Sequence, residues 1–594
     1  MRISRVVVKN YRSLKLVDVQ IVEPATMVIG ENNTGKSNFF QAIRLCLDSQ
    51  LSSAFRSLQK DDVHCQVDQT LPFQVLVGIE FTDFEGRENE EALLHGNQIG
   101  PNRARIFYRF RPKRAVRENI ALGQQAEPLT LEDYGWELFG GGNPAVDLTA
   151  IEWDHENGDL GAASVGLQYL QSYLVVFLPA LRNVEADLQQ SRTSALTKLV
   201  EACAIAPAEQ ATLIAAVQAA NDEIEASPTI QGISTSIDSA LKEISGPAFS
   251  LDVDLGLSAP TFQSIVRNLV VLLSNGLVKQ FEVRRNGLGL NNILHIAMLV
   301  EYFRKRAAIG KAAGELILIE EPEAHLHPQL QATLVEALRA LPFQSMVSTH
   351  STQVTSKSPI SSFVTLTTGT DGVPFVSTPG LAAPLTAEQQ RDLNRFLDAT
   401  KANLLFARKV MLVEGPAELL LVPALAKQVL DIDLEREGIS VIAIHGTHFG
   451  AFSRLFSATC LPKKCAIVGD ADIPPANVVA GDDVPLQENL AALEGPYVRA
   501  FVGATTFERE ITLPGNLAML SRTAQELHAP NLQVSLELQD MLGDAVPEGL
   551  KAQVLRTAKR FGKARFAQVA AGHASHASEL PAYITNAIEW LRQP

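Results

Sequence analysis

One stretch near the amino terminus constrains the fold of this chain more than any other. Residues 27–37 read MVIGENNTGKS, and the segment NFFQAI that follows has the apolar spacing of a helix start. An apolar strand end, a G-x-x-x-x-G-K-S loop and an amphipathic helix form the layout of a phosphate-binding loop. Its glycines let backbone N–H groups converge on phosphate, and the helix N-terminus adds partial positive charge. A chance Gly-rich turn would lack this context, so the stretch predicts an α/β domain that binds a nucleoside triphosphate.

The residues of this loop have separate expected tasks. We expect Lys36 to reach the β- and γ-phosphates of ATP and the Ser37 hydroxyl to hold one Mg²⁺ beside the nucleotide. The loop residues that would surround the phosphates are Gly30, Asn33 and Gly35.

Composition limits the classes of protein to which the chain can belong. Its 594 residues are too many to fold around one hydrophobic core, so several domains are expected. A hydrophobic content of 46% with 20% charged residues is ordinary for a globular protein. The net charge of -15 argues against a protein that coats nucleic acid, but it allows a local basic groove. The five cysteines form no C-x-x-C pair, no signal-peptide core opens the chain, and no apolar run is long enough for a membrane. We therefore expect a cytoplasmic protein with reduced thiols and no membrane contact.

The second half of the nucleotide site is expected on two later strands. Residues 315–323 read ELILIEEPE, an apolar strand that delivers consecutive carboxylates beside the phosphates. Glu320 would bind Mg²⁺, and Glu321 would polarise the attacking water. The strand at 344–349 leads to His350, which falls where ABC ATPases place a switch histidine that contacts the γ-phosphate.

A turn and helix start at 281–294 occupy the place of the ABC signature motif. Asn286, Gly287 and Gly289 would grip the γ-phosphate bound by the opposite subunit, although the sequence departs from Leu-Ser-Gly-Gly-Gln. Farther along, His325 and His327 suggest a metal site, but a turn or interface function is favoured.

The segments around these motifs indicate the domain organisation. Strands are predicted at 3–8, 15–22, 72–81, 104–110, near 150–153 and at 175–182, and with the phosphate loop they resemble the N-terminal lobe of SMC-like and RecF-like ABC ATPases. Ala- and Leu-rich helical spacing at 185–244 predicts an insert that is either a packing subdomain or, as favoured here, a dimerisation arm. The expected divisions are residues 1–184 (ATPase, first part), 185–245 (insert), 246–385 (ATPase, second part) and 400–594.

The C-terminal division carries acids at predicted strand ends. Residues 409–418 read KVMLVEGPAE and residues 465–472 read CAIVGDAD, with the two aspartates expected on one side of a strand. Clustered carboxylates repel one another unless divalent cations neutralise them, and hard oxygen ligands suit Mg²⁺ or Mn²⁺. The order of these acids resembles a Toprim domain, and the expected metal ligands are Glu414, Glu418, Asp470 and Asp472.

Two later stretches extend the predicted site. Residues 504–510 offer a further acid, with Glu508 favoured over Glu510. Residues 551–565 hold six lysines and arginines and no acid, which favours contact with a phosphate backbone over a solvated helix face.

The whole arrangement resembles the OLD (overcoming lysogenization defect) family of nucleases. The segments 319–328, 413–418, 506–508 and 562–567 carry the resemblance. It implies Mg²⁺- or Mn²⁺-dependent nicking or cleavage of DNA, ATP as the controlling input, a homodimer and a part in phage defence or DNA processing. It also implies that Lys563 lies near the scissile phosphate, and some members work with a UvrD-like helicase.

The expected fold is therefore α/β: an ABC-type (SMC/RecF-like) P-loop ATPase with a helical insert, followed by a C-terminal Toprim domain. The expected reaction is phosphodiester hydrolysis by two metals about 3.5–4 Å apart, with Glu414, Asp470 and Lys563 as catalytic groups. Two other functions stay open: an SMC-like, ATP-driven DNA clamp without nuclease activity, and a primase- or topoisomerase-like Toprim enzyme. The absence of a tyrosine close in sequence to the acids argues against a covalent topoisomerase-type intermediate.

Overall fold

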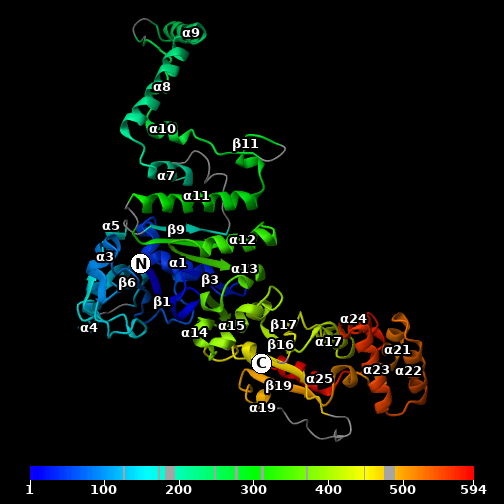
Figure 1. Cartoon of the computed structure of the whole chain (residues 1–594). Helices are drawn as coiled ribbons and strands as arrows, with labels where there is room; N and C mark the ends of the chain where they lie inside the picture. The colour runs from blue at the N-terminus through cyan, green and yellow to red at the C-terminus, as the bar shows by residue number, and fades with distance from the viewer. Residues whose placement is uncertain are drawn as a thin grey trace. The chain divides into compact units, whose positions relative to one another are not determined.

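The computed structural model of the chain forms two compact units (Figure 1). The first unit comprises residues 1–179, 313–323 and 327–594, and the second comprises 180–312 and 324–326. The structure describes residues 1–124, 128–170, 174–180, 194–246, 249, 251–274, 278–309, 313–369, 372–446, 448–473 and 488–593. Among these residues, no helix is both long and apolar enough to cross a bilayer.

A six-stranded sheet of the first unit positions the phosphate loop. Its strand order is β15-β14-β3-β13-β12-β9, and every pairing is parallel except that of β14 with β15. All six residues of β3 and of β13 are buried, as expected for strands covered on both faces. The strands are β3 (Ala25–Gly30), β9 (Leu174–Leu178), β12 (Glu315–Glu320), β13 (Gln344–Thr349), β14 (Phe363–Thr368) and β15 (Pro374–Ser377). The strand predicted at 175–182 is confirmed as β9, although residues 181 and 182 lie outside the described residues.

A second, antiparallel sheet packs in the same unit and contains the four amino-terminal strands predicted from sequence. Its order is β2-β1-β4-β6-β7-β8, with β5 paired to β6. The strands are β1 (Arg2–Tyr11), β2 (Leu14–Gln20), β4 (Val75–Thr82), β5 (Gln98–Gly100), β6 (Arg103–Pro112), β7 (Tyr134–Gly141) and β8 (Ala162–Ser164). The helices around the two sheets are α1 (Lys36–Leu47), α2 (Ser53–Arg56), α3 (Glu88–Leu94), α4 (Arg114–Ala121), α5 (Leu167–Leu170), α12 (Pro328–Arg339), α13 (Thr352–Ser356), α14 (Pro379–Ala382) and α15 (Ala387–Phe396).

The strand predicted near residues 150–153 is wrong. The chain forms a 3₁₀ turn at Leu148–Ala150 and then runs irregularly. Side chains take the carbonyls that a strand would offer to a neighbour: Gln74 Nε2 donates to the Ile151 carbonyl at 2.6 Å, and Arg109 Nη2 donates to the Glu152 carbonyl at 2.8 Å. These tertiary contacts override the local apolar pattern.

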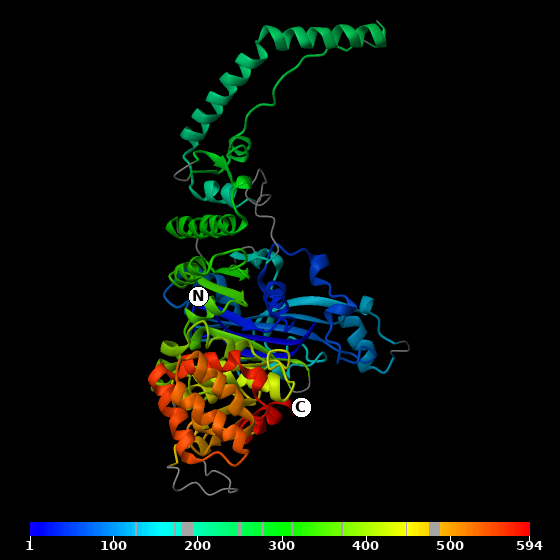
Figure 2. The same cartoon turned by 90° about the vertical axis from the view of Figure 1, so that its right-hand side faces the viewer.

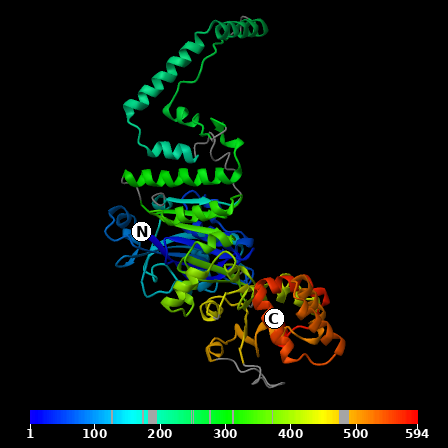
Figure 3. The same cartoon turned by 45° about the vertical axis from the view of Figure 1, so that its right-hand side comes forward.

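The C-terminal part of the first unit is built on a four-stranded parallel sheet, in the order β17-β16-β18-β19. Figure 3 shows the C-terminal helices, orange to red, beside these strands. The strands are β16 (Lys409–Val413), β17 (Ile439–Ala443), β18 (Cys465–Asp470) and β19 (Val498–Gly503). The helices are α16 (Asn403–Phe406), α17 (Pro416–Val429), α18 (Phe449–Ser453), α19 (Glu488–Ala491), α20 (Phe507–Glu510), α21 (Leu517–Glu526), α22 (Pro530–Leu542), α23 (Glu548–Phe561), α24 (Lys563–Gly572) and α25 (Ala582–Arg592). Because all four strands are parallel, their carboxyl ends share one edge, where ligands bind in open α/β sheets.

The second unit is mainly helical, and it contains the segment predicted as an insert. Its elements are α7 (Ala195–Ala202), α8 (Pro207–Glu225), α9 (Pro228–Ser245), α10 (Phe262–Arg267), β10 (Leu272–Leu273), β11 (Phe281–Glu282) and α11 (Leu288–Ala308). Figure 2 shows α8 and α9 as successive helices of an extended arm, along which the chain returns. No residue of α8 or α9 is buried, and both helices expose apolar side chains such as Leu213 and Ile233. The helical character of the insert is confirmed, and its use in dimerisation stays a prediction.

Candidate functional site

The phosphate loop lies where its sequence places it, between β3 and α1. A Cβ atom added at Gly30 would lie 2.0 Å from the Leu366 carbonyl oxygen, and one at Gly35 would lie 2.5 Å from Ser13 Oγ. Gly35 also has a φ of 93°, and Asn33 has a φ of 64°, so the loop uses left-handed backbone at two positions. The close approach of neighbouring atoms explains why both glycines are required.

Lys36 folds back onto this loop. Its Nζ donates to the carbonyl oxygens of Gly30 at 3.0 Å and Glu31 at 2.6 Å. Burial lowers the pKa of Lys36 to about 8, while the charges of Glu321 and Glu31 oppose that shift. A bound phosphate would supply negative charge to this buried ammonium. Ser37, the next residue, is exposed and accessible to a nucleotide-bound cation.

The predicted water-polarising residue Glu321 lies close to the predicted switch histidine His350. Glu320 is buried at the end of β12, and Glu321 follows with a φ of 44°, a left-handed conformation uncommon for glutamate. His350 Nε2 lies 3.4 Å from Glu321 Oε1. Burial, and then the charge of Lys36, lower the pKa of His350. Glu321, His350 and Lys36 therefore face a common site beside the phosphate loop.

Glu323 is a residue of this site that the sequence reasoning missed. Its Oε1 accepts hydrogen bonds from Thr349 Oγ1 at 2.6 Å and from the His350 backbone N–H at 3.0 Å. Glu323 therefore fixes the end of β13 and with it the position of His350. The third acid of the EEPE run was the only available signal, since its partners lie on another strand.

The predicted signature segment has an exposed helix start. Gly287 caps α11, and Asn286 Nδ2 donates to Asn291 Oδ1 at 3.1 Å, which fixes the turn. A Cβ atom added at Gly289 would lie only 2.4 Å from the His325 carbonyl oxygen, so a glycine is needed there. His327 caps α12, where its Nδ1 accepts the Gln329 N–H at 3.4 Å, in agreement with the favoured turn function.

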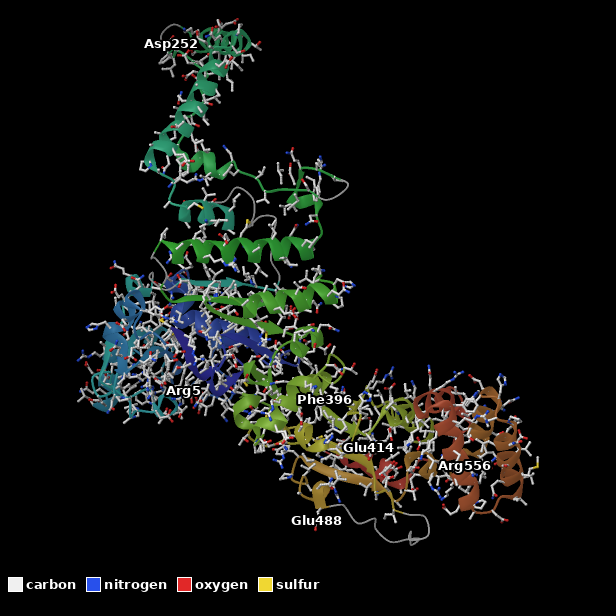
Figure 4. All side chains as sticks on the ribbon, in the orientation of Figure 1. Arg5, Asp252, Phe396, Glu414, Glu488 and Arg556 are labelled. Atoms are coloured by element: carbon white, nitrogen blue, oxygen red, sulfur yellow. The ribbon has the colours of Figure 1, made fainter. Side chains whose placement is uncertain are left out.

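The acids of the C-terminal sheet converge at its carboxyl edge. Glu414 Oε1 accepts the backbone N–H of Asp470 at 2.9 Å, and Asp470 Oδ2 accepts the Phe507 N–H at 2.9 Å. Glu418 Oε2 accepts the Gly415 N–H at 3.2 Å at the start of α17. Backbone donors therefore orient all three carboxylates, and Figure 4 labels Glu414 at this edge.

Glu508 joins the cluster together with Lys563. Glu508 is 2% exposed, and its Oε2 lies 2.9 Å from Lys563 Nζ. Neither oxygen of Glu508 accepts a conventional hydrogen bond from the described residues beyond that ion pair. Glu510, the fallback acid, instead accepts the N–H and hydroxyl of Thr505, at 2.8 and 2.5 Å. The geometry thus agrees with the preference for Glu508.

Asp472 departs from the sequence expectation. We expected Asp470 and Asp472 to project to one side of a strand, but β18 ends at Asp470 and Asp472 has a φ of 50°. Strand alternation therefore does not govern Asp472, which is exposed. Burial mainly, with the charge of Asp472 as a smaller contribution, raises the pKa of Glu414, so Asp472 still acts on the cluster.

The electrostatics of this cluster suit a bound cation. Burial raises the pKa of Asp470 to about 8, with a further contribution from the charge of Glu414, and burial raises the pKa of Glu418 to about 7. Within the described ranges, no three acidic, histidine or cysteine side chains stand in ready ligand geometry. The donor set nevertheless fits Mg²⁺ or Mn²⁺, because it offers hard carboxylate oxygens and a buried Glu508 whose one ion pair among the described residues is with Lys563.

Tyr583 is distant in sequence from these acids, but it lies near them in the structure. Gly503 is directly opposite Asp470 in the β18–β19 register, and a Cβ atom added at Gly503 would lie 3.0 Å from Tyr583 Cζ. Burial, and then the charge of Asp470, raise the pKa of Tyr583. The helix α25 brings this ring to the site from the end of the chain, and no local sequence pattern could have revealed it.

The basic segment, residues 551–565, contains a bend beside the acid cluster. Gly562 has a φ of 91° between α23 and α24, and it leaves Lys563 as the first residue of α24. Arg565 lines a groove of about 800 Å³ between α17, α21 and α24, which also contains Gln568 and His573. The exposed cations of the segment are Arg556, Lys559, Arg560, Lys563 and Arg565.

Comparisons with known proteins match two separate regions of the chain. Residues 405–472 match the family model of the overcoming lysogenization defect protein-like TOPRIM domain, and residues 1–127 and 167–355 match an AAA ATPase domain. The Old nuclease of Escherichia phage P2 is 24% identical over 489 residues, which are 75% of this chain and 73% of that protein. The OLD nuclease of Thermus scotoductus is 24% identical over 522 residues, or 84% of this chain and 89% of that protein. The solved C-terminal region of the Burkholderia pseudomallei OLD protein is 30% identical and covers 32% of this chain and 98% of its own length, with a TM-score of 0.26.

The phosphate loop with its carboxylate strand and histidine thus lies in one matched region, and the acids Glu414, Glu418, Asp470 and Asp472 lie in the other. The chain therefore belongs to the OLD family and joins an ABC-type ATPase domain to a C-terminal Toprim domain.

Proposed function

We propose that this protein is an ATP-binding DNA endonuclease that hydrolyses phosphodiester bonds at its Toprim site with Mg²⁺ or Mn²⁺. One observation carries the proposal: carboxylates from β16–α17, β18 and α20 converge on a partly buried site that also contains Lys563. The names of the two relatives, both nucleases, support the same activity. A DNA clamp without nuclease activity would have no use for so costly a concentration of partly buried acids.

Each group of the site has a proposed task. Two bound ions would lower the pKa of a water nucleophile and stabilise the leaving oxygen. Glu414, Glu418, Asp470, Asp472 and Glu508 would hold them directly or through water. Lys563 is 44% exposed, so its ammonium can leave Glu508 and contact the phosphate once a cation balances the carboxylate.

The DNA would approach along the basic segment of α23 and α24. Four of its exposed cations, Arg556, Lys559, Arg560 and Arg565, have no carboxylate partner within 4 Å among the described residues. Contacts of this kind bind the backbone independently of sequence and weaken with salt. They also give a protein of net charge -15 a local surface that a polyanion tolerates.

Nucleotide binding and dimerisation complete the proposal. Ser37 and Glu320 would hold the Mg²⁺ of ATP, and the exposed start of α11 would contact the nucleotide of a second copy. The exposed apolar residues of α8 and α9 support an arm that binds its counterpart in a homodimer. Family membership favours action in phage defence, with a UvrD-like helicase as partner.

Cleavage of supercoiled plasmid tests the proposal. The wild type should convert plasmid to nicked or linear product with Mg²⁺ or Mn²⁺ and not with a chelator. Glu414→Gln keeps the side-chain shape but removes a ligand charge, and it should slow cleavage at least about 100-fold. The matched control, Glu589→Gln, changes an exposed glutamate of α25 and should cut like the wild type. Equal rates in all three proteins would refute the assignment.

A further inference from the structure

The phosphate loop is tied to the Toprim domain through one carboxylate. Glu31, the residue after Gly30, is 14% exposed, and its Oε2 lies 3.1 Å from Arg408 Nε. Its Oε1 lies 3.9 Å from Lys463 Nζ. We call this arrangement the Glu31 contact. It joins two regions that are far apart in sequence, and both belong to the same compact unit.

Of the two cations that contact Glu31, Lys463 is the buried one. Its side chain is 3% exposed, while that of Arg408 is 76% exposed and therefore well screened by solvent. Lys463 Nζ donates to the carbonyls of Leu405 at 3.0 Å and Ala407 at 2.7 Å. Burial lowers the pKa of Lys463 to about 8, and Glu31 is the carboxylate that opposes the shift. The buried ammonium thus depends on Glu31 for its counter-charge.

Both cations stand at the beginning of strands that end in the acid cluster. Arg408 immediately precedes β16, after which comes Glu414, and Lys463 lies two residues before β18, which ends at Asp470. Strands of five or six residues span roughly 15–20 Å at about 3.3 Å per residue. β16 and β18 pair directly with each other, so a displacement at their amino ends moves them as one piece.

The backbone of Glu31 is held by residues of the phosphate loop that would meet a bound nucleotide. The Glu31 carbonyl accepts hydrogen bonds from Lys36 Nζ at 2.6 Å and from Thr34 Oγ1 at 2.9 Å. A phosphate in the loop competes for the Lys36 ammonium and draws it away from that carbonyl. The same residue whose carboxylate holds Lys463 therefore loses a backbone restraint when nucleotide binds.

We propose that the Glu31 contact transmits nucleotide occupancy from the phosphate loop to strands β16 and β18, and thereby regulates the Toprim site. The regulatory part rests on the proposed nuclease function, whereas the mechanical link does not.

Two other contacts also join the ATPase part of the unit to the Toprim part, at what we call the junction, and they provide a control. Ser377 Oγ donates to the Cys460 carbonyl at 2.6 Å, and Arg454 Nη1 donates to the Pro384 carbonyl at 3.3 Å. Neither contact includes a residue of the phosphate loop. Arg454→Gln therefore weakens the junction without touching the Glu31 contact.

Hydrogen exchange of the full chain, with and without a saturating non-hydrolysable ATP analogue, tests the link. In the wild type, amide exchange in residues 409–413 and 465–469 should change roughly fivefold or more when the analogue binds. Arg408→Gln combined with Lys463→Met should remove this response, and Arg454→Gln should keep it. Glu31→Gln breaks the contact from the opposite side, so it must lose the response as well, even if the double variant fails to fold.

A parallel plasmid assay separates this inference from the proposed function. The ratio of cleavage rates with and without the analogue should differ from one in the wild type and approach one in the double variant. An exchange response that depends on the Glu31 contact, without DNA cleavage in any variant, keeps the link and refutes the nuclease. Cleavage together with no exchange response in the wild type, or an unchanged response in both contact variants, overturns the link.

Discussion

Lys563→Ala offers a sharp test of the acid cluster, because in the absence of metal this lysine balances the charge of the buried Glu508. Its ammonium lies 2.9 Å from Glu508, a carboxylate with 2% exposure. Removal of one partner of a fully buried pair costs about 3–5 kcal/mol. Lys563 itself is 44% exposed, so solvent screening reduces the expected loss to about 1–2 kcal/mol. For a domain of 150–250 residues that loss corresponds to a melting temperature lower by roughly 2–8 °C.

Divalent metal should reverse much of that loss. If the carboxylates hold metal, Mn²⁺ supplies the positive charge that Lys563 supplied, so the melting temperature of Lys563→Ala should rise more with Mn²⁺ than that of the wild type. Plasmid cleavage by the variant should still fall by a factor of about 10²–10³, since the phosphate loses its cationic contact.

A matched variant shows how much of the effect comes from the burial of Glu508. Lys551 lies 3.4 Å from Glu548, whose side chain is 55% exposed, so Lys551→Ala should change stability by about 0–1 kcal/mol and respond to Mn²⁺ like the wild type. The reasoning is refuted if Lys563→Ala melts like Lys551→Ala without metal, or if Mn²⁺ raises all three melting temperatures equally.

Further predictions concern the other parts of the chain. Lys36→Ala should weaken nucleotide binding, and Glu321→Gln should bind nucleotide but hydrolyse it more slowly; equal hydrolysis by Glu321→Gln and wild type would show that another group polarises the water. Replacement of residues 185–245 by a short linker should give a monomer in light scattering, whereas a dimer would make the insert a packing subdomain. Tyr583→Phe should cut plasmid within a few-fold of the wild-type rate, because water is the proposed nucleophile. A covalent adduct between wild-type protein and DNA that disappears in Tyr583→Phe would instead support the topoisomerase-like alternative.

The sequence predicted those parts of the site that local patterns encode. The phosphate loop, the Glu320–Glu321 strand end and the acids after β16 and β18 each follow from a short apolar strand and the residues directly after it. Parallel strands then bring these ends to a common edge, which is why acids from separate segments meet. The expected α/β class and family are confirmed, because they rest on the same local motifs.

Features that depend on tertiary contacts were not predictable. Glu323 acts through Thr349, and Tyr583 reaches the acids through packing against Gly503. The pairing of Glu31 with Lys463 requires two domains to meet. Asp472 failed the alternation rule because the strand ends two residues earlier, a boundary that apolar patterning does not locate.

One paired measurement tests the central claim that DNA is cut at the Toprim carboxylates and ATP is hydrolysed at the phosphate loop. Nicking and ATP hydrolysis would be measured in parallel for the wild type, Asp470→Ala and Lys36→Ala, in Mg²⁺ and in Mn²⁺. Asp470→Ala should lose nicking and keep ATP hydrolysis, while Lys36→Ala should lose hydrolysis and keep part of the metal-dependent nicking. Nicking by Asp470→Ala at the wild-type rate would contradict the nuclease assignment and leave an ATP-driven DNA clamp as the better account.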